Sequence, residues 1–125
     1  MNTQEMTAWT QHTYGGPEVV APETAPVPVP GAGEIVLAMR AVSLNSADAR
    51  IMRGDPLLVR LAFGLRRPRV AVQGRDVAGE VVSVGAGVTS AAVGDRVVGE
   101  LAGGGLAPFV LTKANKVVPI PAGLD

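Results

Sequence analysis

Short apolar runs separated by turn residues dominate the sequence, and this pattern predicts a protein made mainly of β-strands. Apolar and polar positions alternate over residues 6–12, and a longer β-type run covers 34–44, which we expect to be the longest strand. Shorter runs predict further strands, over 18–20, 76–84, 96–98, 109–111 and 116–118. Turn signals that recur about every 8–12 residues indicate a barrel or a sandwich.

Two short helices are predicted directly after the long strand. The first begins at Asn45 and Ser46, which are typical N-cap residues, and ends at Gly54. Asp48 lies three positions after Asn45, an arrangement close to a capping box. The second helix covers Leu57 to Phe63 and is apolar on nearly every side, so we expect part of it to contact a substrate, a second subunit or another domain.

Composition limits the possible classes of protein. The chain has 125 residues, 47% of them hydrophobic, which corresponds to one domain with a real core. It contains no cysteine, and this excludes disulfides, thiolate metal sites and a cysteine nucleophile. We therefore expect a cytoplasmic protein. No apolar run is long enough to span a bilayer, and we expect no membrane partner.

Charge is balanced overall but unevenly distributed. Residues 40–75 carry eight arginines and two aspartates, whereas both flanking segments are net acidic. Such a basic block can bind nucleic acid, here through Arg60, Arg66, Arg67, Arg69 and Arg75. Aromatic residues for base stacking are nearly absent nearby, so a solvated surface is the favoured interpretation and we expect no nucleic-acid partner.

Two familiar functional motifs, a dinucleotide-binding fingerprint and a catalytic triad, are present only in part. The Gly-x-Gly pairs at 31–33 and 85–87 lack the third glycine and the following helix of a dinucleotide fingerprint, so both are interpreted as turns. His12, Ser46 and Asp48 supply the residue types of a catalytic triad. Nothing in the sequence brings the single histidine to Ser46, and a solvent-facing strand histidine is favoured.

The Asn45, Ser46 and Asp48 group admits two interpretations. Capping of the first helix explains all three residues. Alternatively, the corner between the long strand and this helix exposes them at the mouth of a barrel, where they would contact a ligand. The residues alone leave both open.

Five motifs in order resemble one known family. They are YGGPEV at 14–19, PVPVPGAGEIV at 26–36, VSLNSAD at 42–48, GRDVAGEVVSVGAGVT at 74–89 and VGDRV at 93–97. Together they resemble the N-terminal, GroES-like catalytic domain of the medium-chain dehydrogenase/reductase superfamily, in its zinc-free quinone oxidoreductase branch. The resemblance covers residues 6–125 and implies a mainly β fold, a GroES-like partly open β-barrel with one or two short helices.

The resemblance also implies the chemistry of the site. Zinc alcohol dehydrogenases carry a cysteine where this chain has Asn45, and a Gly-His-Glu motif where it has residues 74–76, so no metal is expected. Asn45 and Asp48 become the candidate catalytic residues, with Asn45 also contacting the cofactor. The candidate substrate-binding residues are Ser46, Arg50, Leu57 and Leu61. Arg50 and Pro108 depart from the family, which usually has an aromatic and an acidic residue there.

The implied function is that of the substrate-side domain, residues 1–125, of an NADPH-dependent quinone or enone oxidoreductase that transfers hydride without zinc. Family members continue from the Pro-x-Gly-Leu segment at 121–124 into a Rossmann domain that holds NADPH. We therefore expect that domain to be absent from this chain, and the chain alone to be inactive. The alternative is a freestanding, non-enzymatic binding module that uses the barrel cleft and the apolar helix. The sequence leaves open whether the chain forms a homo-oligomer.

Overall fold

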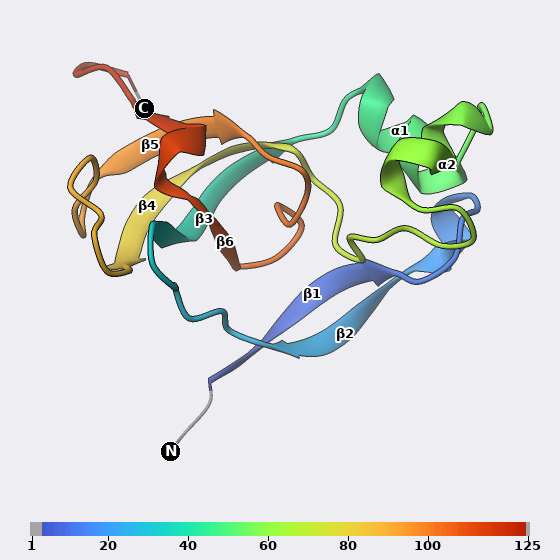
Figure 1. The fold of residues 1–125 in the computed structure, drawn as a ribbon, viewed down its shortest axis with the longest axis horizontal. Coiled ribbons are helices and arrows are strands. Elements are labelled where there is room, and N and C mark those ends of the chain that lie inside the picture. The colour runs from blue at the N-terminus through green and yellow to red at the C-terminus, as the bar shows by residue number, and fades with distance from the viewer. Residues whose placement is uncertain (1–3, 125) are drawn as a thin grey trace.

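The computed structural model describes residues 4–124, which form two β-sheets and two α-helices (Figure 1). The strands are β1 (Glu5–Gln11), β2 (Val20–Pro26), β3 (Glu34–Ser43), β4 (Asp76–Val84), β5 (Arg96–Glu100), β6 (Phe109–Lys113) and β7 (Val117–Pro119). The helices are α1 (Ser46–Arg53) and α2 (Leu58–Phe63), and single 3₁₀ turns occur at Pro17–Val19 and Ala114–Lys116. None of the helices in this part of the chain is long and apolar enough to cross a membrane.

Five antiparallel strands form the main sheet, in the order β6-β3-β4-β5-β7, and β1 pairs with β2 in a separate sheet. Strand β1 is attached to the loops that precede β6 and β4, because the Trp9 N–H donates to the Leu106 carbonyl (3.0 Å) and the Gln11 N–H donates to the Ala71 carbonyl (2.7 Å). Since the end strands β6 and β7 do not pair with each other, the barrel stays open. The expected mainly β, partly open, GroES-like barrel is confirmed.

The core lies on one face of the main sheet. Alternate residues of β4, Val77 and Val81, point into it and meet Ile35 and Leu37 of β3 and Val97 of β5. All five side chains are at most 2% exposed. A register shift between Val36 and Leu37 interrupts the strict alternation of β3, and three consecutive residues are buried there.

Helix α1 has the boundaries that its capping residues predict. Asn45 is the N-cap, and a capping box with Asp48 is formed. The helix ends at Gly54, whose φ of 64° lies in the left-handed region that favours glycine. A Cβ at Gly54 would also lie only 2.7 Å from the Tyr14 ring, so glycine is required there for space as well.

The sequence prediction needs one correction in the first half of the chain. Residues 18–20 were expected to form the strand that pairs with the first one. Instead, Pro17–Val19 forms a 3₁₀ turn with the proline in its first turn, and β2 begins at Val20. Proline fixes φ near the helical value, which favours such a turn. The predicted strands over 34–44 and 76–84 are confirmed as β3 and β4.

Candidate functional site

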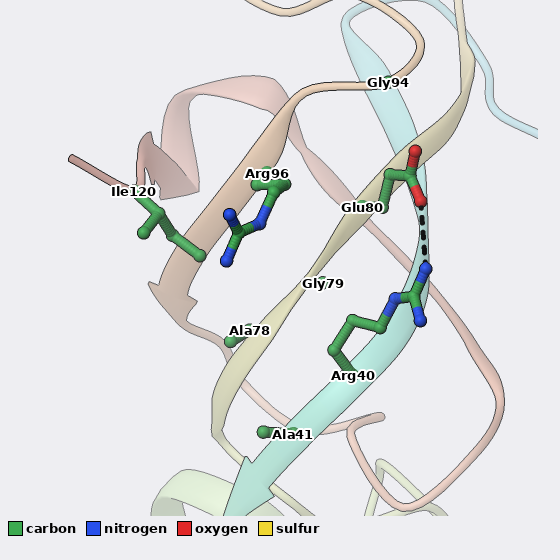
Figure 2. Close-up of a pocket in the computed structure, with 8 residues that line it drawn as sticks. All are labelled: Arg40, Ala41, Ala78, Gly79, Glu80, Gly94, Arg96 and Ile120. Carbon is green, nitrogen blue, oxygen red and sulfur yellow. Dashed lines mark hydrogen bonds and ion pairs between the residues drawn. The ribbon is translucent and has the colours of Figure 1, made fainter. Parts of the chain in front are cut away.

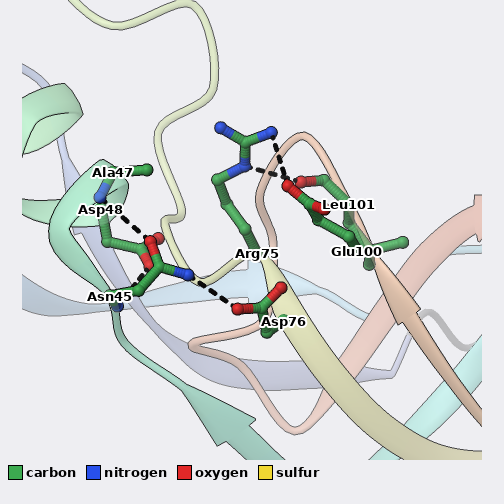
Figure 3. A network of polar contacts seen from close by, with 7 residues as sticks. All are labelled: Asn45, Ala47, Asp48, Arg75, Asp76, Glu100 and Leu101. Carbon is green, nitrogen blue, oxygen red and sulfur yellow. Dashed lines mark hydrogen bonds and ion pairs between the residues drawn. The ribbon is translucent and has the colours of Figure 1, made fainter.

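The register of the main sheet brings the candidate polar residues to one end of it. Ser43 at the end of β3 pairs with Asp76 at the start of β4, and Asp76 pairs with Glu100 at the end of β5. The end of β3, the start of β4 and the end of β5 therefore lie side by side at one end of the sheet. The polar residues around these three strand ends meet there (Figure 3). These residues are Asn45, Arg75, Asp76, Glu100 and Leu101.

Two hydrogen bonds fix the orientation of the Asn45 amide. Its Oδ1 accepts from the Ala47 N–H at 3.0 Å, and its Nδ2 donates to Asp76 Oδ2 at 2.7 Å (Figure 3). Reversing the amide would place a donor against the Ala47 N–H and an acceptor against the carboxylate, so only one orientation satisfies both partners. Asn45 is exposed, and its second amide hydrogen has no partner among residues 4–124. It is free to donate to a bound molecule.

Asp48 positions the backbone rather than the amide of Asn45. Its Oδ2 accepts from the Asn45 backbone N–H at 3.0 Å, and the residue is 5% exposed. Its Oδ1 is buried without a hydrogen-bond partner in the described chain. The carboxylate therefore holds the first turn of α1 in place beneath Asn45, and its predicted catalytic role stays a prediction.

Arg75 points away from the Asn45–Asp76 pair (Figure 3). Its Nε donates to the Leu101 carbonyl at 3.1 Å, and a terminal guanidinium nitrogen lies 3.3 Å from Glu100 Oε1. The guanidinium also lies 5.8 Å from the centre of the Phe63 ring, a contact between the residue just before β4 and the last residue of α2. Arg75 thus connects two elements around the site and leaves Asp76 to the amide.

An apolar cavity of about 430 Å³ lies beside Asn45. Asn45 and Asp48 form part of its wall, and the rest comes mainly from Trp9, Pro17, Val20, Leu44, Ala49, Met52, Gln73 and Leu106. Sequence reasoning missed this cavity, because its walls come from β1, the 3₁₀ turn, α1 and the loop before β6. The one signal in the sequence was Trp9, the single tryptophan, which lies in a predicted strand. In the structure its side chain is half-exposed.

Comparison with known proteins places this geometry in a family. A family model for the alcohol dehydrogenase GroES-like domain matches residues 31–122. The chain belongs to this family. A chloroplast envelope quinone oxidoreductase homolog of Arabidopsis thaliana is 37% identical over 120 residues, which is 93% of this chain and 35% of that protein. The match confirms the resemblance to the medium-chain dehydrogenase/reductase superfamily.

Solved structures agree with this assignment. A mycobacterial protein complexed with NADPH superposes with a TM-score of 0.78 at 29% identity, over 96% of this GroES-like chain and 34% of the other. A putative zinc-dependent alcohol dehydrogenase from Rhizobium etli superposes with a TM-score of 0.82 at 27% identity, over 99% and 35%. The chain spans about a third of the length of the quinone oxidoreductase relatives that it matches.

The predicted substrate-binding residues of this GroES-like domain do not share a wall with Asn45 and Asp48. Ser46 and Arg50 are exposed on α1, and Leu57 and Leu61 are 71% and 63% exposed. None of the four lines the apolar cavity. Their role in substrate binding stays a prediction.

The remaining triad residue is also elsewhere. His12 follows β1, is exposed, and its Nε2 lies 2.7 Å from Glu23 Oε2 of β2. This agrees with the favoured interpretation of a solvent-facing histidine. The arrangement holds two strands together and offers no general base to Ser46.

A second pocket crosses the middle of β3, β4 and β5 (Figure 2). Its floor consists of the small residues Ala41, Ala78 and Gly79, and Arg40 and Glu80 form an ion pair of 3.3 Å at its side. It contains none of the residues predicted for the site. The ion pair neutralises Arg40, one of the two arginines that line this pocket. We therefore do not assign the function of this domain to this pocket.

Proposed function

We propose that this chain is the substrate-side domain of an NADPH-dependent quinone or enone oxidoreductase that works without zinc. The observation that carries the proposal is the Asn45 amide, which is oriented by Asp76 and has one free N–H. The Arabidopsis relative named as a quinone oxidoreductase homolog and the NADPH-bound mycobacterial structure support the reaction class and the cofactor.

When bound, the nicotinamide cofactor would supply hydride to the conjugated carbon of the substrate, and negative charge would then develop on the carbonyl oxygen of the substrate. A donor that is already oriented toward that oxygen stabilises the charge without reorganisation. The free N–H of Asn45 is such a donor. Asp76 holds the amide plane, and Asp48 holds the backbone on which the amide is carried. Water completes the protonation of the oxygen.

The donor set at this position does not suit zinc. Zinc prefers about four nitrogen, sulfur or carboxylate ligands in a tetrahedron. Here Asn45 stands where zinc alcohol dehydrogenases carry a cysteine, and Asp76 Oδ2 already accepts from the amide. No group of three or more His, Cys, Asp or Glu residues comes together anywhere in residues 4–124. Zinc-free chemistry is therefore the form of the reaction that we propose.

The N-terminus of α1 also does not fit the phosphates of NADPH. Helix N-termini bind pyrophosphate through free backbone N–H groups. At α1, the Ala47 N–H donates to Asn45 Oδ1 and the Asn45 N–H donates to Asp48 Oδ2, so both groups are already taken. We therefore assign the hydride donor to another part of the enzyme. Contact between Asn45 and the cofactor stays a prediction.

A nuclear magnetic resonance titration tests the substrate side directly. Adding 1,4-naphthoquinone to the ¹⁵N-labelled chain should shift the side-chain amide resonances of Asn45 in a saturable way. Asn115, an exposed asparagine in the 3₁₀ turn before β7, is the internal control and should not shift. Equal shifts at both amides, or none at Asn45, would contradict the proposal.

The enzymatic arm uses the product of the complete reading frame. NADPH oxidation in the presence of naphthoquinone should fall about 100-fold in kcat when Asn45 is replaced by Ala, the loss typical of one removed oxyanion donor. The 125-residue chain should show no saturable NADPH binding in the micromolar range by calorimetry. Near-stoichiometric zinc in protein purified without chelator would overturn the zinc-free assignment.

A further inference from the structure

Helix α2 presents its leucines to solvent. Leu57 and Leu58 are 71% and 73% exposed, and Leu61 is 63% exposed. Leu61 lies three residues after Leu58 and four after Leu57, the N-cap residue, so the three side chains lie on the same side of this helix. No residue of α2 is buried. Leu65, just after the helix, is 67% exposed and continues this apolar face into the following loop.

Contacts of the opposite side of α2 explain why the leucines face outward. Arg60 donates from Nε to the Gly54 carbonyl at 3.1 Å, and its guanidinium lies 4.6 Å from the centre of the Tyr14 ring. Phe63 lies against Arg75 of the main body. The helix is therefore attached to the domain through Arg60 and Phe63. It lies at the periphery, beside α1 and away from the five-stranded sheet (Figure 1).

The loop after α2 forms a basic groove next to this apolar face. The groove has a volume of about 580 Å³, and Leu65 and the three loop arginines, at 66, 67 and 69, line it together with His12. All three arginines are exposed, and none takes part in an ion pair found in the described chain. Because Leu65 belongs to both features, the apolar face and the basic groove adjoin.

The charge of this region decides between its possible occupants. Residues 53–69 contain five arginines and one aspartate, a net charge of +4. A symmetric contact with a second copy would bring two such surfaces together, and like charges repel. An occupant that is both apolar and anionic matches the leucines and the arginines at once. An anionic lipid bilayer has this combination, with acyl chains beneath a layer of phosphates.

We propose that the leucine–arginine surface, formed by Leu57, Leu58, Leu61, Leu65 and the arginines of the 66–69 loop, docks on anionic lipid membranes. The leucines enter the boundary between headgroups and acyl chains, and the loop arginines bind lipid phosphates. This peripheral contact needs no spanning helix. It departs from the sequence expectation of no membrane partner, which rested on the absence of a spanning segment.

Vesicle flotation tests the proposal. The 125-residue protein should float with vesicles of phosphatidylcholine and phosphatidylserine and stay in solution with phosphatidylcholine alone, and high salt should release it. Leu58→Ser/Leu61→Ser should weaken binding about tenfold, since the two side chains lose their burial in the bilayer. Arg66→Gln/Arg67→Gln should weaken it about 30-fold and reduce its salt dependence.

Matched variants elsewhere on the surface serve as controls. Val93→Ser/Leu124→Ser removes two exposed apolar side chains, and Lys113→Gln/Lys116→Gln removes two positive charges; both should bind like the unmodified protein. Thermal melts confirm that each variant is folded. The proposal is overturned if no vesicle binds, or if the control variants lose as much affinity as the test variants. It is also overturned if the leucine variant only lowers self-association, or if inorganic phosphate binds the loop but vesicles do not.

Discussion

Asn45 Nδ2 donates to Asp76 Oδ2 at 2.7 Å, a contact between residues 31 positions apart that joins the N-cap of α1 to the first residue of β4. The same amide accepts from the Ala47 N–H, so one side chain caps the helix and ties it to the sheet. This double use explains why capping and a role in the site, which the sequence offered as alternatives, are compatible.

Replacing Asn45 by Asp should destabilise the protein at neutral pH by about 1 kcal/mol, the value of a typical hydrogen bond. Aspartate still caps the helix, but its carboxylate then faces that of Asp76. Two carboxylates in contact repel each other when both are charged. The destabilisation should therefore be present at neutral pH and disappear at acid pH, where carboxylates are protonated. Urea unfolding at several pH values measures it.

The reciprocal variant is the control. Asn45→Asp/Asp76→Asn restores one amide and one carboxylate with the roles exchanged, and it should recover most of the lost stability. If the double variant is as unstable as the sum of the two single ones, the contact between these side chains is not the cause.

Asp48→Ala should lower the free energy of unfolding by about 1 kcal/mol, since it removes one half of the capping box. The amide resonance of Asn45 should shift as well, because its N–H loses the acceptor at 3.0 Å. Asp55→Ala, at an exposed aspartate just beyond the helix, is the matched control and should change neither quantity. A purely electrostatic effect of removing a carboxylate would instead appear in both variants.

Local signals predicted much of the fold. Asn45, Asp48 and Gly54 fixed the bounds of α1, because capping depends on residues only a few positions apart. The contact between Asn45 and Asp76 depends on sheet register, which no local pattern contains. The apolar cavity was missed for the same reason, since it needs Trp9 and Leu106 on either side of α1. The apolar character of α2 was visible, but its outward-facing leucines depend on the tertiary contacts of Arg60.

Leu58→Ser/Leu61→Ser should leave the stability of the domain nearly unchanged, by about 0.5 kcal/mol or less per site, since both side chains are mostly exposed. Leu37→Ala, in the core of the main sheet and fully buried, should lower it by about 2–5 kcal/mol. Chemical denaturation of the three proteins gives the comparison. Unfolding of the serine variant would mean that α2 belongs to the core, contrary to its observed exposure.

Glu23 should titrate below the ordinary range of glutamates. The hydrogen bond from the Thr10 hydroxyl at 2.7 Å lowers the pKa of Glu23 most, and the hydrogen bond with His12 lowers it further. Because the folded pKa is depressed, the stability linked to Glu23 is present above the unfolded pKa and is lost as pH falls through the folded one.

Thr10→Val should therefore raise the pKa of Glu23 measured by nuclear magnetic resonance titration of its side-chain carbon, and His12→Gln should raise it less. Thr24→Val, at an exposed threonine next to Glu23 in β2, is the matched control and should leave that pKa unchanged. If Thr24→Val shifts the pKa as much as Thr10→Val does, the cause is a general change in the sheet. The outcome thus separates the specific hydroxyl contact from the loss of any threonine beside this carboxylate.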